Sequence, residues 1–417
     1  MSGIELWAKV LLAVVAVAGW TALARWRRAG AGRGHADVVW LWCLTRLGLL
    51  LAVWLVSGLD APSDIQRFYL PQARAALDGA LVYRDIVSSY GPLFPYLAAL
   101  PIAVWNRGAA LVVFAILWEL AAMAAWGALA RRHRGGDEAV RALRLYLCNP
   151  LAIVNVVLVG QNQVWMAALW GGAAWLLARR RAFAAGVVAM LSVVGVKLLG
   201  LLALPALWWR AGSRRRFAAG AALAAIVAVV PFAAAGADVL QPLRLEGDQL
   251  TSGNLPYLLT LVGLDPGVPA LTWPLTALAA AALLVTAALV ERTAAGDPAA
   301  DRVIPLETAL SCLMLVFLLV SRKSYASYLA IVLLPLSTAV VAARLRLWQQ
   351  AAFLALCGLA TIEPSLWFRW MEEATLARLD GWHAAAFLLV EGVLVAGYVG
   401  LLVAIWPSRR LTPSSAP

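Results

Sequence analysis

Apolar runs of about 20 residues recur along this 417-residue chain, and they constrain its fold more than any other feature. Each run is long enough for an α-helix to cross the hydrocarbon core of a bilayer. The chain is 63% hydrophobic and only 13% charged, whereas a soluble domain is roughly half apolar and a quarter charged. We therefore predict an all-α, polytopic bundle of about 11–13 transmembrane helices. We expect a multi-pass protein of a cell membrane, either a bacterial inner membrane or a plasma membrane.

The net charge of +12 comes from short arginine clusters between apolar runs. That placement is typical of cytoplasmic loops under the positive-inside rule, and it argues against nucleic acid as a partner. The four cysteines lie inside apolar runs, so we expect no disulfide. The three histidines are far apart, which makes a histidine metal site improbable. The first run, 4–24, has no basic segment before it and no clear cleavage site, so we expect a helix there.

The basic clusters can all be cytoplasmic at once, and this fixes the order of the crossings. The assignment places the N-terminus outside and the C-terminus inside, with polar loops gathered on the outer face. The apolar segment Leu93–Trp105 would break the order if it crossed. Pro92 just before it and Pro95 and Pro101 within it oppose a plain spanning helix, so we expect it to dip into the outer face. The predicted spans are 4–24, 37–57, 107–130, 142–159, 162–178, 182–195, 197–210, 217–235, 268–290, 303–320, 328–343, 347–361 and 383–406.

The first outer loop, residues 58–91, carries the richest set of polar side chains. We predict short interfacial helices there, with Ser63 as N-cap, a distortion at Pro71 and a stop at Gly79. Asp64 would be a carboxylate at the mouth of a membrane cavity, placed to act as a general base, or else an acid stabilised by the helix dipole. Asp85 is a second candidate, although Arg84 beside it is also typical of a solvated turn.

Three cations on the outer side violate the positive-inside pattern: Lys197, Arg322 and Lys323. Together they would suit a phosphate anion entering from the lipid. The alternative is interfacial snorkelling, which is common near helix ends. Four further charged residues lie within predicted spans, where structural pairing or a helix-end position is the better explanation; they are Arg46, Glu119, Glu307 and Glu391.

The outer turn at Gly160 carries the carboxamides of Gln161 and Asn162. Carboxamides donate and accept hydrogen bonds, which suits sugar hydroxyls, but they also cap turns. Asn149-Pro150 is more typical of a helix start.

The ordered motifs resemble a known family. Asp64 is followed by an Ala-rich helix, Tyr-x-Asp ending at Asp85, and Tyr-Gly-Pro-Leu beginning at Tyr90. Then come Cys-Asn-Pro-Leu, Gly-Gln-Asn-Gln, Val-Lys-Leu around Lys197, Gly253-Asn254 and Ser-Arg-Lys-Ser-Tyr. This set resembles the GT-C superfamily of glycosyltransferases. It looks closest to the bacterial polyprenyl-phosphate-mannose-dependent branch and the related GPI mannosyltransferases.

The resemblance implies an inverting transfer of a sugar, possibly mannose, from a polyprenyl-phosphate carrier to an extracytoplasmic glycan or lipid acceptor. It implies that Asp64 is the general base and that Asp85 matches a later acid. Lys197 and Arg322 would lie near the lipid phosphate, with Lys323 where relatives often carry histidine. Gln161, Asn162, Tyr90 and Asn254 would complete the binding residues. Gln163 replaces an aspartate that is frequent in relatives.

The resemblance implies no cofactor. The dependence on a divalent metal stays open, although the three cations would make such an ion unnecessary. The resemblance covers roughly residues 37–345, which we expect to form the catalytic core. Residues 1–36 would add an N-terminal helix and a basic cytoplasmic loop. Residues 346–417 would add C-terminal helices and a short polar tail.

Two other functions are compatible with these features. A transporter or lipid flippase would also need many helices and intramembrane charges, although such proteins often show two related halves and this sequence has no half-repeat. A non-catalytic assembly subunit could keep the fold and lose the activity.

Overall fold

The computed structural model describes residues 3–28, 34–58, 64–247, 250–259, 264, 268–295, 305–370 and 381–406. Throughout these ranges the regular structure is helical, with one isolated bridge between Val82 and Ile86. The all-α prediction is therefore confirmed. Ser63, the predicted N-cap, lies outside the described residues.

The helices follow the predicted apolar runs closely. The α-helices are α1 (Gly3–Arg28), α2 (Gly34–Trp42), α3 (Leu70–Leu77), α4 (Phe94–Val104), α5 (Gly108–Arg134), α6 (Gly136–Leu147), α7 (Pro150–Ile153), α8 (Gln163–Ala178), α9 (Ala182–Val194), α10 (Leu204–Trp209), α11 (Arg214–Ala234), α12 (Gln241–Gly247), α13 (Leu255–Leu258), α14 (Pro269–Ala295), α15 (Leu306–Val320), α16 (Leu333–Ala342), α17 (Leu347–Trp370) and α18 (Gly381–Ile405). The π- and 3₁₀-helical segments are η1 (Cys43–Gly48), η2 (Leu50–Val56), η3 (Ile65–Tyr69), η4 (Val154–Leu158), η5 (Leu198–Ala203) and η7 (Ala326–Val332).

Fewer helices are long enough for a full crossing than the 11–13 predicted. Within the described ranges, six helices have the length and composition to span a membrane, or seven if α6 with α7–η4, bent by 63°, counts as one. The other predicted crossings correspond to shorter apolar helices such as α8 and α9. Sequence hydrophobicity marks these segments correctly, but a helix of 16 residues such as α8 is only about 24 Å long. The chain is a multi-pass membrane protein.

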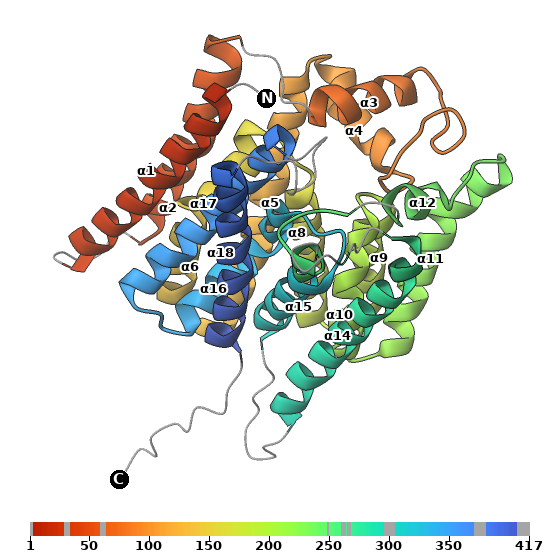
Figure 1. The fold of residues 1–417 in the computed structure, drawn as a ribbon. Helices are drawn as coiled ribbons and strands as arrows, with labels where there is room; N and C mark the ends of the chain where they lie inside the picture. The colour runs from red at the N-terminus through yellow and green to blue at the C-terminus, as the bar shows by residue number, and fades with distance from the viewer. Residues whose placement is uncertain are drawn as a thin grey trace.

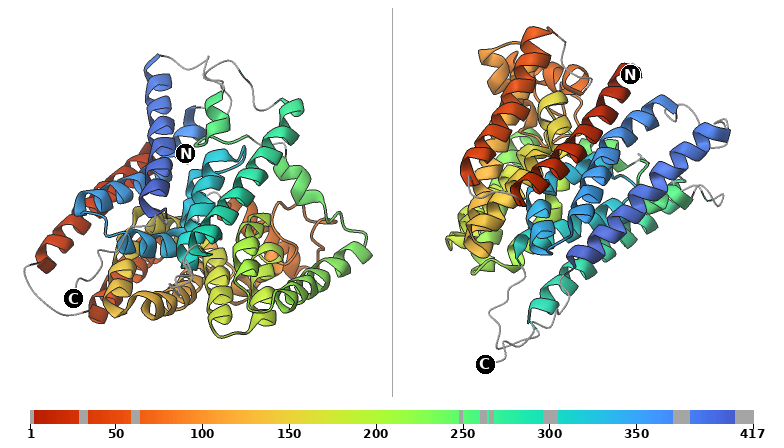
Figure 2. Two further views of the ribbon diagram at one scale, coloured as in Figure 1. Left: turned by 90° about the horizontal axis from the view of Figure 1, so that it is seen from below. Right: turned by 90° about the vertical axis from the view of Figure 1, so that its left-hand side faces the viewer.

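The helices form one bundle with distinct ends (Figure 1). The start of α1 lies at the same end as α3 and α4, whereas the end of α18 lies at the opposite end (Figures 1 and 2). Neighbouring packing pairs include α9 with α11, α5 with α8, and α6 with α16. Helix α1 packs against α17, so the first helix and the C-terminal helices lie side by side.

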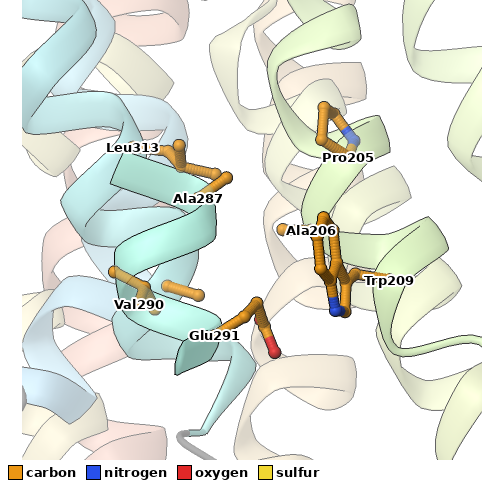
Figure 3. A pocket seen from close by; sticks show the side chains of 8 residues that line it. Pro205, Ala206, Trp209, Ala287, Val290, Glu291 and Leu313 are labelled. Carbon is orange, nitrogen blue, oxygen red and sulfur yellow. The ribbon is translucent and has the colours of Figure 1, made fainter. Parts of the chain in front are cut away.

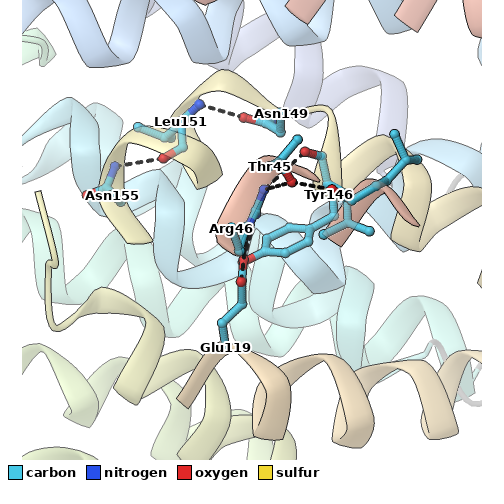
Figure 4. Close-up of polar contacts among 9 residues, drawn as sticks. Thr45, Arg46, Glu119, Tyr146, Asn149, Leu151 and Asn155 are labelled. Carbon is cyan, nitrogen blue, oxygen red and sulfur yellow. Dashed lines mark hydrogen bonds and ion pairs between the residues drawn. The ribbon is translucent and has the colours of Figure 1, made fainter. Parts of the chain in front are cut away.

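A buried ion pair joins three helical segments inside the bundle. Arg46 donates through Nε and Nη2 to the carboxylate of Glu119, with Nη2 at 2.6 Å. Tyr146 donates to the same carboxylate at 2.7 Å, and Arg46 Nη1 donates to Thr45 Oγ1 and to the carbonyl of Leu147 (Figure 4). Both charged side chains are fully buried. The predicted structural pairing of Arg46 and Glu119 is confirmed.

The other two acids within predicted spans, Glu307 and Glu391, also make contacts that stabilise the fold. Glu307, in the first turn of α15, lies 3.6 Å from Arg134 and 3.9 Å from His133, so its helix-end role is confirmed. Glu391 of α18 accepts a hydrogen bond from the backbone of Gly253. Asn149 caps α7 by accepting from the backbone of Leu151 at 2.9 Å (Figure 4), which confirms the predicted helix start.

The first outer loop folds as two short helices, as expected. η3 and α3 meet just before Pro71, and Gly79 follows with φ +85°. Segment Leu93–Trp105 contains α4, which is only 11 residues long.

Candidate active site

Asp64 is held in place by the turn after η4. Gln161 Nε2 donates to Asp64 Oδ2, and Gln161 Oε1 accepts from the Tyr69 hydroxyl at 2.9 Å. Gly160, with φ +59°, lets Ile65 pack onto this turn, because an added Cβ would lie 2.7 Å from Ile65 Cδ1. Asp64 itself is partly exposed. The predicted base and the predicted carboxamide turn are therefore direct partners, with Gln161 orienting the carboxylate.

The Tyr-Gly-Pro-Leu motif joins the first outer loop to the turn that carries Lys197. Gly91 N donates to the Val196 carbonyl at 3.0 Å, and Leu93 N donates to the Val194 carbonyl at 2.9 Å. A Cβ at Gly91 would lie 2.4 Å from the Val194 carbonyl oxygen, so only glycine permits this approach. The motif thus places Tyr90 beside Lys197.

Lys197 stands among aromatic rings. Its Nζ donates to the Tyr328 hydroxyl at 2.8 Å. It lies 5.2 Å from the ring centroid of Tyr328 and 5.7 Å from that of Tyr90, within the range of a cation–π interaction. Tyr90 also packs edge-on against Tyr69, with ring centroids 5.4 Å apart, and Tyr69 donates to the Gln161 that holds Asp64. The predicted base and the predicted phosphate-binding lysine therefore share one aromatic environment.

Lys323 joins the group through an acid that the sequence analysis did not single out. Glu246, near the end of α12, lies 3.3 Å from Lys197 Nζ through Oε1 and forms an ion pair with Lys323 through Oε2. Burial and the neighbouring charge of Lys197 lower the pKa of Lys323 and Glu246 raises it, which leaves a pKa of about 8. Lysines within the membrane region need an acidic partner, because an unpaired charge there is costly. This requirement was the one feature of the sequence that indicated an acid such as Glu246.

Arg322 precedes Lys323 in the chain and is buried, with 6% of its surface exposed. Its Nε and Nη1 have no hydrogen-bond partner among the described residues. Its carbonyl accepts from the Thr251 backbone at 3.0 Å, and the Thr251 hydroxyl accepts from the Ser324 backbone at 2.8 Å. A buried guanidinium with free donors is suited to bind an anion.

Asn254 shapes the segment beside Arg322 instead of offering free polar atoms. Its Oδ1 accepts from the Tyr257 backbone at 2.9 Å, and its Nδ2 donates to the Thr251 carbonyl at 2.7 Å. Ser252 and Gly253 donate to the buried acids Glu363 and Glu391. Asn254 therefore serves as an N-cap, and helices α17 and α18 support the segment that holds the Arg322 loop.

Asp85 lies apart from this group, whereas Asn162 directly follows Gln161 in the sequence. Asp85 pairs with Arg84 at 2.9 Å and accepts from the Leu81 backbone at 2.8 Å. The Arg84 guanidinium holds the pKa of this exposed carboxyl below its usual range. The contacts of Asp85 are thus those of a turn, and they do not join it to Asp64. Asn162 is buried, and its Nδ2 has no hydrogen-bond partner within the described part of the chain.

No group of three or more His, Cys, Asp or Glu side chains that could hold a metal occurs within the described residues.

The hollow drawn in Figure 3 lies between α10 and α14. It is lined by Trp209 and Glu291 among apolar side chains and leaves no room for a water-sized group. The polar cluster around Asp64, Lys197 and Glu246 is therefore the candidate active site.

Comparisons with known proteins give one family-model match and a similarity of fold. Residues 69–213 match the family model described as alpha-(1->6)-mannopyranosyltransferase, N-terminal domain. None of the curated proteins matches the chain. The fold is similar to the crystal structure of ArnT from Cupriavidus metallidurans in the apo state, with 16% identity and a TM-score of 0.51 over 89% of this chain and 76% of that one. The ArnT structure bound to undecaprenyl phosphate gives 15% identity and a TM-score of 0.50 over 87% and 76%.

The matched family model indicates a glycosyltransferase, and the apolar helices are those of a multi-pass membrane protein. The mannosyltransferase match agrees with the resemblance drawn from the ordered motifs, and the similarity to ArnT is one of fold. The match favours the enzyme interpretation over the transporter interpretation.

Proposed function

We propose that this enzyme transfers a sugar, with mannose as the first candidate, from a polyprenyl-phosphate carrier to an acceptor hydroxyl on the extracytoplasmic side, with inversion. The observation that carries the proposal is a continuous series of contacts between the two residues Asp64 and Lys197. Gln161 donates to Asp64 and accepts from Tyr69, and Tyr69 packs against Tyr90, whose ring lies 5.7 Å from Lys197 Nζ. The mannopyranosyltransferase model supports the sugar. The ArnT structure that holds undecaprenyl phosphate has a similar fold, which supports the carrier.

Two groups of residues carry the two halves of the reaction, one at the acceptor and one at the leaving phosphate. The acceptor oxygen attacks the anomeric carbon, its proton passes to the Asp64 carboxylate, and the bond from that carbon to the phosphate oxygen breaks. The phosphate leaves with the bonding electron pair, and Lys197, Lys323 and Arg322 stabilise its charge. Phosphate is a fair leaving group, so no strong general acid is needed. Gln161 holds Asp64 in position through its amide.

Substitution of the proposed base tests the assignment. Asp64→Asn keeps the shape of the side chain and can still accept from Gln161, so the protein should fold and reach the membrane in normal amounts. We expect transfer of radiolabelled sugar from a polyprenyl-phosphate donor to fall roughly a hundredfold or more. Asp78→Asn, which removes an exposed acid from the same loop, should keep wild-type transfer. A wild-type rate in Asp64→Asn would remove Asp64 from the role of base.

A further inference from the structure

The Glu246 carboxylate bridges the two lysines of the candidate site. One oxygen lies 3.3 Å from Lys197 Nζ, and the other pairs with Lys323 Nζ. The side chains of Glu246, Lys197 and Lys323 are 19%, 14% and 12% exposed, so the bridge is largely shielded from water. An acid in this position occupies the place where two ammonium groups would hold an anion.

Lys197 has at most one donor left over for a phosphate while this bridge exists. An ammonium group has three N–H donors and no acceptor. Lys197 directs one to the Tyr328 hydroxyl and one toward Glu246, and it faces the rings of Tyr90 and Tyr328. Of these partners only Glu246 is charged, so an incoming phosphate would bind Lys197 by replacing this carboxylate.

The attachment of α12 allows such a replacement without moving the helix. The start of this segment is fixed, because Gln241 Oε1 accepts from the Ser88 backbone at 2.8 Å and Asp238 N donates to the Tyr83 carbonyl at 3.1 Å. Glu246 lies at the other end of the helix, where its carboxylate contacts the two lysines. Rotation about its side-chain bonds is enough to release both lysines.

We infer that Glu246 is a displaceable counter-ion that competes with the lipid phosphate for Lys197 and Lys323 and so promotes release of the polyprenyl phosphate product. The inference rests on the proposed function. A phosphodiester donor carries one negative charge, whereas the phosphate monoester product carries about −1.5 to −2 at neutral pH. Two lysines and Arg322 without a competing acid would hold the more highly charged product more tightly than the donor. The returning carboxylate opposes that effect.

The test is the affinity for the product, measured without turnover. The Kd of undecaprenyl phosphate is determined for the detergent-solubilised full chain and for Glu246→Gln and Glu246→Ala, with undecaprenol as the probe that lacks phosphate. Both variants should bind undecaprenyl phosphate roughly tenfold more tightly than the wild type, with an unchanged Kd for undecaprenol. Asp238→Asn is the matched control, because it removes an exposed acid of the same segment that pairs with Arg244 and not with the lysines.

The outcomes separate this inference from the proposed function. Equal or weaker binding of undecaprenyl phosphate by both variants would show that Glu246 positions the lysines, and it would overturn the counter-ion role. If the wild type binds undecaprenyl phosphate no better than undecaprenol, the phosphate site itself fails and the inference fails with it. Tighter binding cannot arise from a misfolded variant, so the expected result is not open to that objection.

Discussion

Two ion-pair clusters in this chain differ in whether their charged groups are fully paired, and we relate this difference to structure in one case and to function in the other. At Arg46 and Glu119 the donors of a planar guanidinium meet a carboxylate, and Tyr146 completes the arrangement. At Lys197, Lys323 and Glu246 a single carboxylate is shared between two ammonium groups, and the buried Arg322 nearby has two donors without partners in the described chain. The first cluster is saturated, whereas the second can accept another anion.

The saturated cluster should matter most for stability. Glu119→Leu leaves the Arg46 charge buried without its partner, and we expect the free energy of unfolding to fall by about 3–5 kcal/mol. The measurement is denaturant or thermal unfolding of the purified protein in detergent. The double variant Arg46→Met, Glu119→Leu should recover most of this loss, because replacing a buried pair by apolar side chains is often close to neutral. A double variant as unstable as the single one would contradict the assignment.

The unsaturated cluster should matter most for catalysis. Lys197→Ala removes a charge that we place at the leaving phosphate, and kcat/KM for the lipid-linked donor should fall roughly a hundredfold. Unfolding should change far less than in Glu119→Leu, since Lys197 is partly exposed. Arg244→Ala, which removes an exposed cation from α12, serves as the control. Unaltered donor kinetics in Lys197→Ala would exclude this lysine from the site.

The smallest expected effect is a pH dependence of binding. Lys323 has a pKa of about 8, so it carries its charge below that pH and loses it as the pH rises. The affinity for undecaprenyl phosphate should therefore weaken several-fold between about pH 7 and about pH 9, a range in which the phosphate monoester itself changes little. Lys323→Arg stays protonated throughout and should give a flatter profile. Identical profiles for the two proteins would assign the dependence to another group.

The sequence predicted the helices well because apolar length is a local property. The runs, the break before Pro71 and the turn at Gly79 needed no knowledge of distant residues. The predicted spans 162–178 and 182–195 match α8 and α9 closely. Within the described ranges, however, the helices with the length and composition for a full crossing number six or seven, fewer than the 11–13 spans predicted.

The candidate site was predicted in parts but not as an assembly. Asp64, Gln161 and Lys197 stood out by charge or by turn chemistry, yet their proximity depends on Gly91 and Gly160 allowing close packing between distant segments. Asn254 caps a helix, a use that composition does not separate from ligand binding. Glu246 lies 49 residues after Lys197 and 77 before Lys323, and no local pattern connects such positions.

A doubly labelled donor tests the central claim most directly. A polyprenyl phosphosugar with one isotope in the sugar and another in the phosphate is supplied to the wild-type enzyme in proteoliposomes, together with a membrane extract as the source of acceptor. The claim predicts that each sugar transferred releases one polyprenyl phosphate that keeps its phosphorus, and that Asp64→Asn does neither. Movement of the intact donor across the membrane without cleavage would contradict it, as would transfer that Asp64→Asn performs at the wild-type rate.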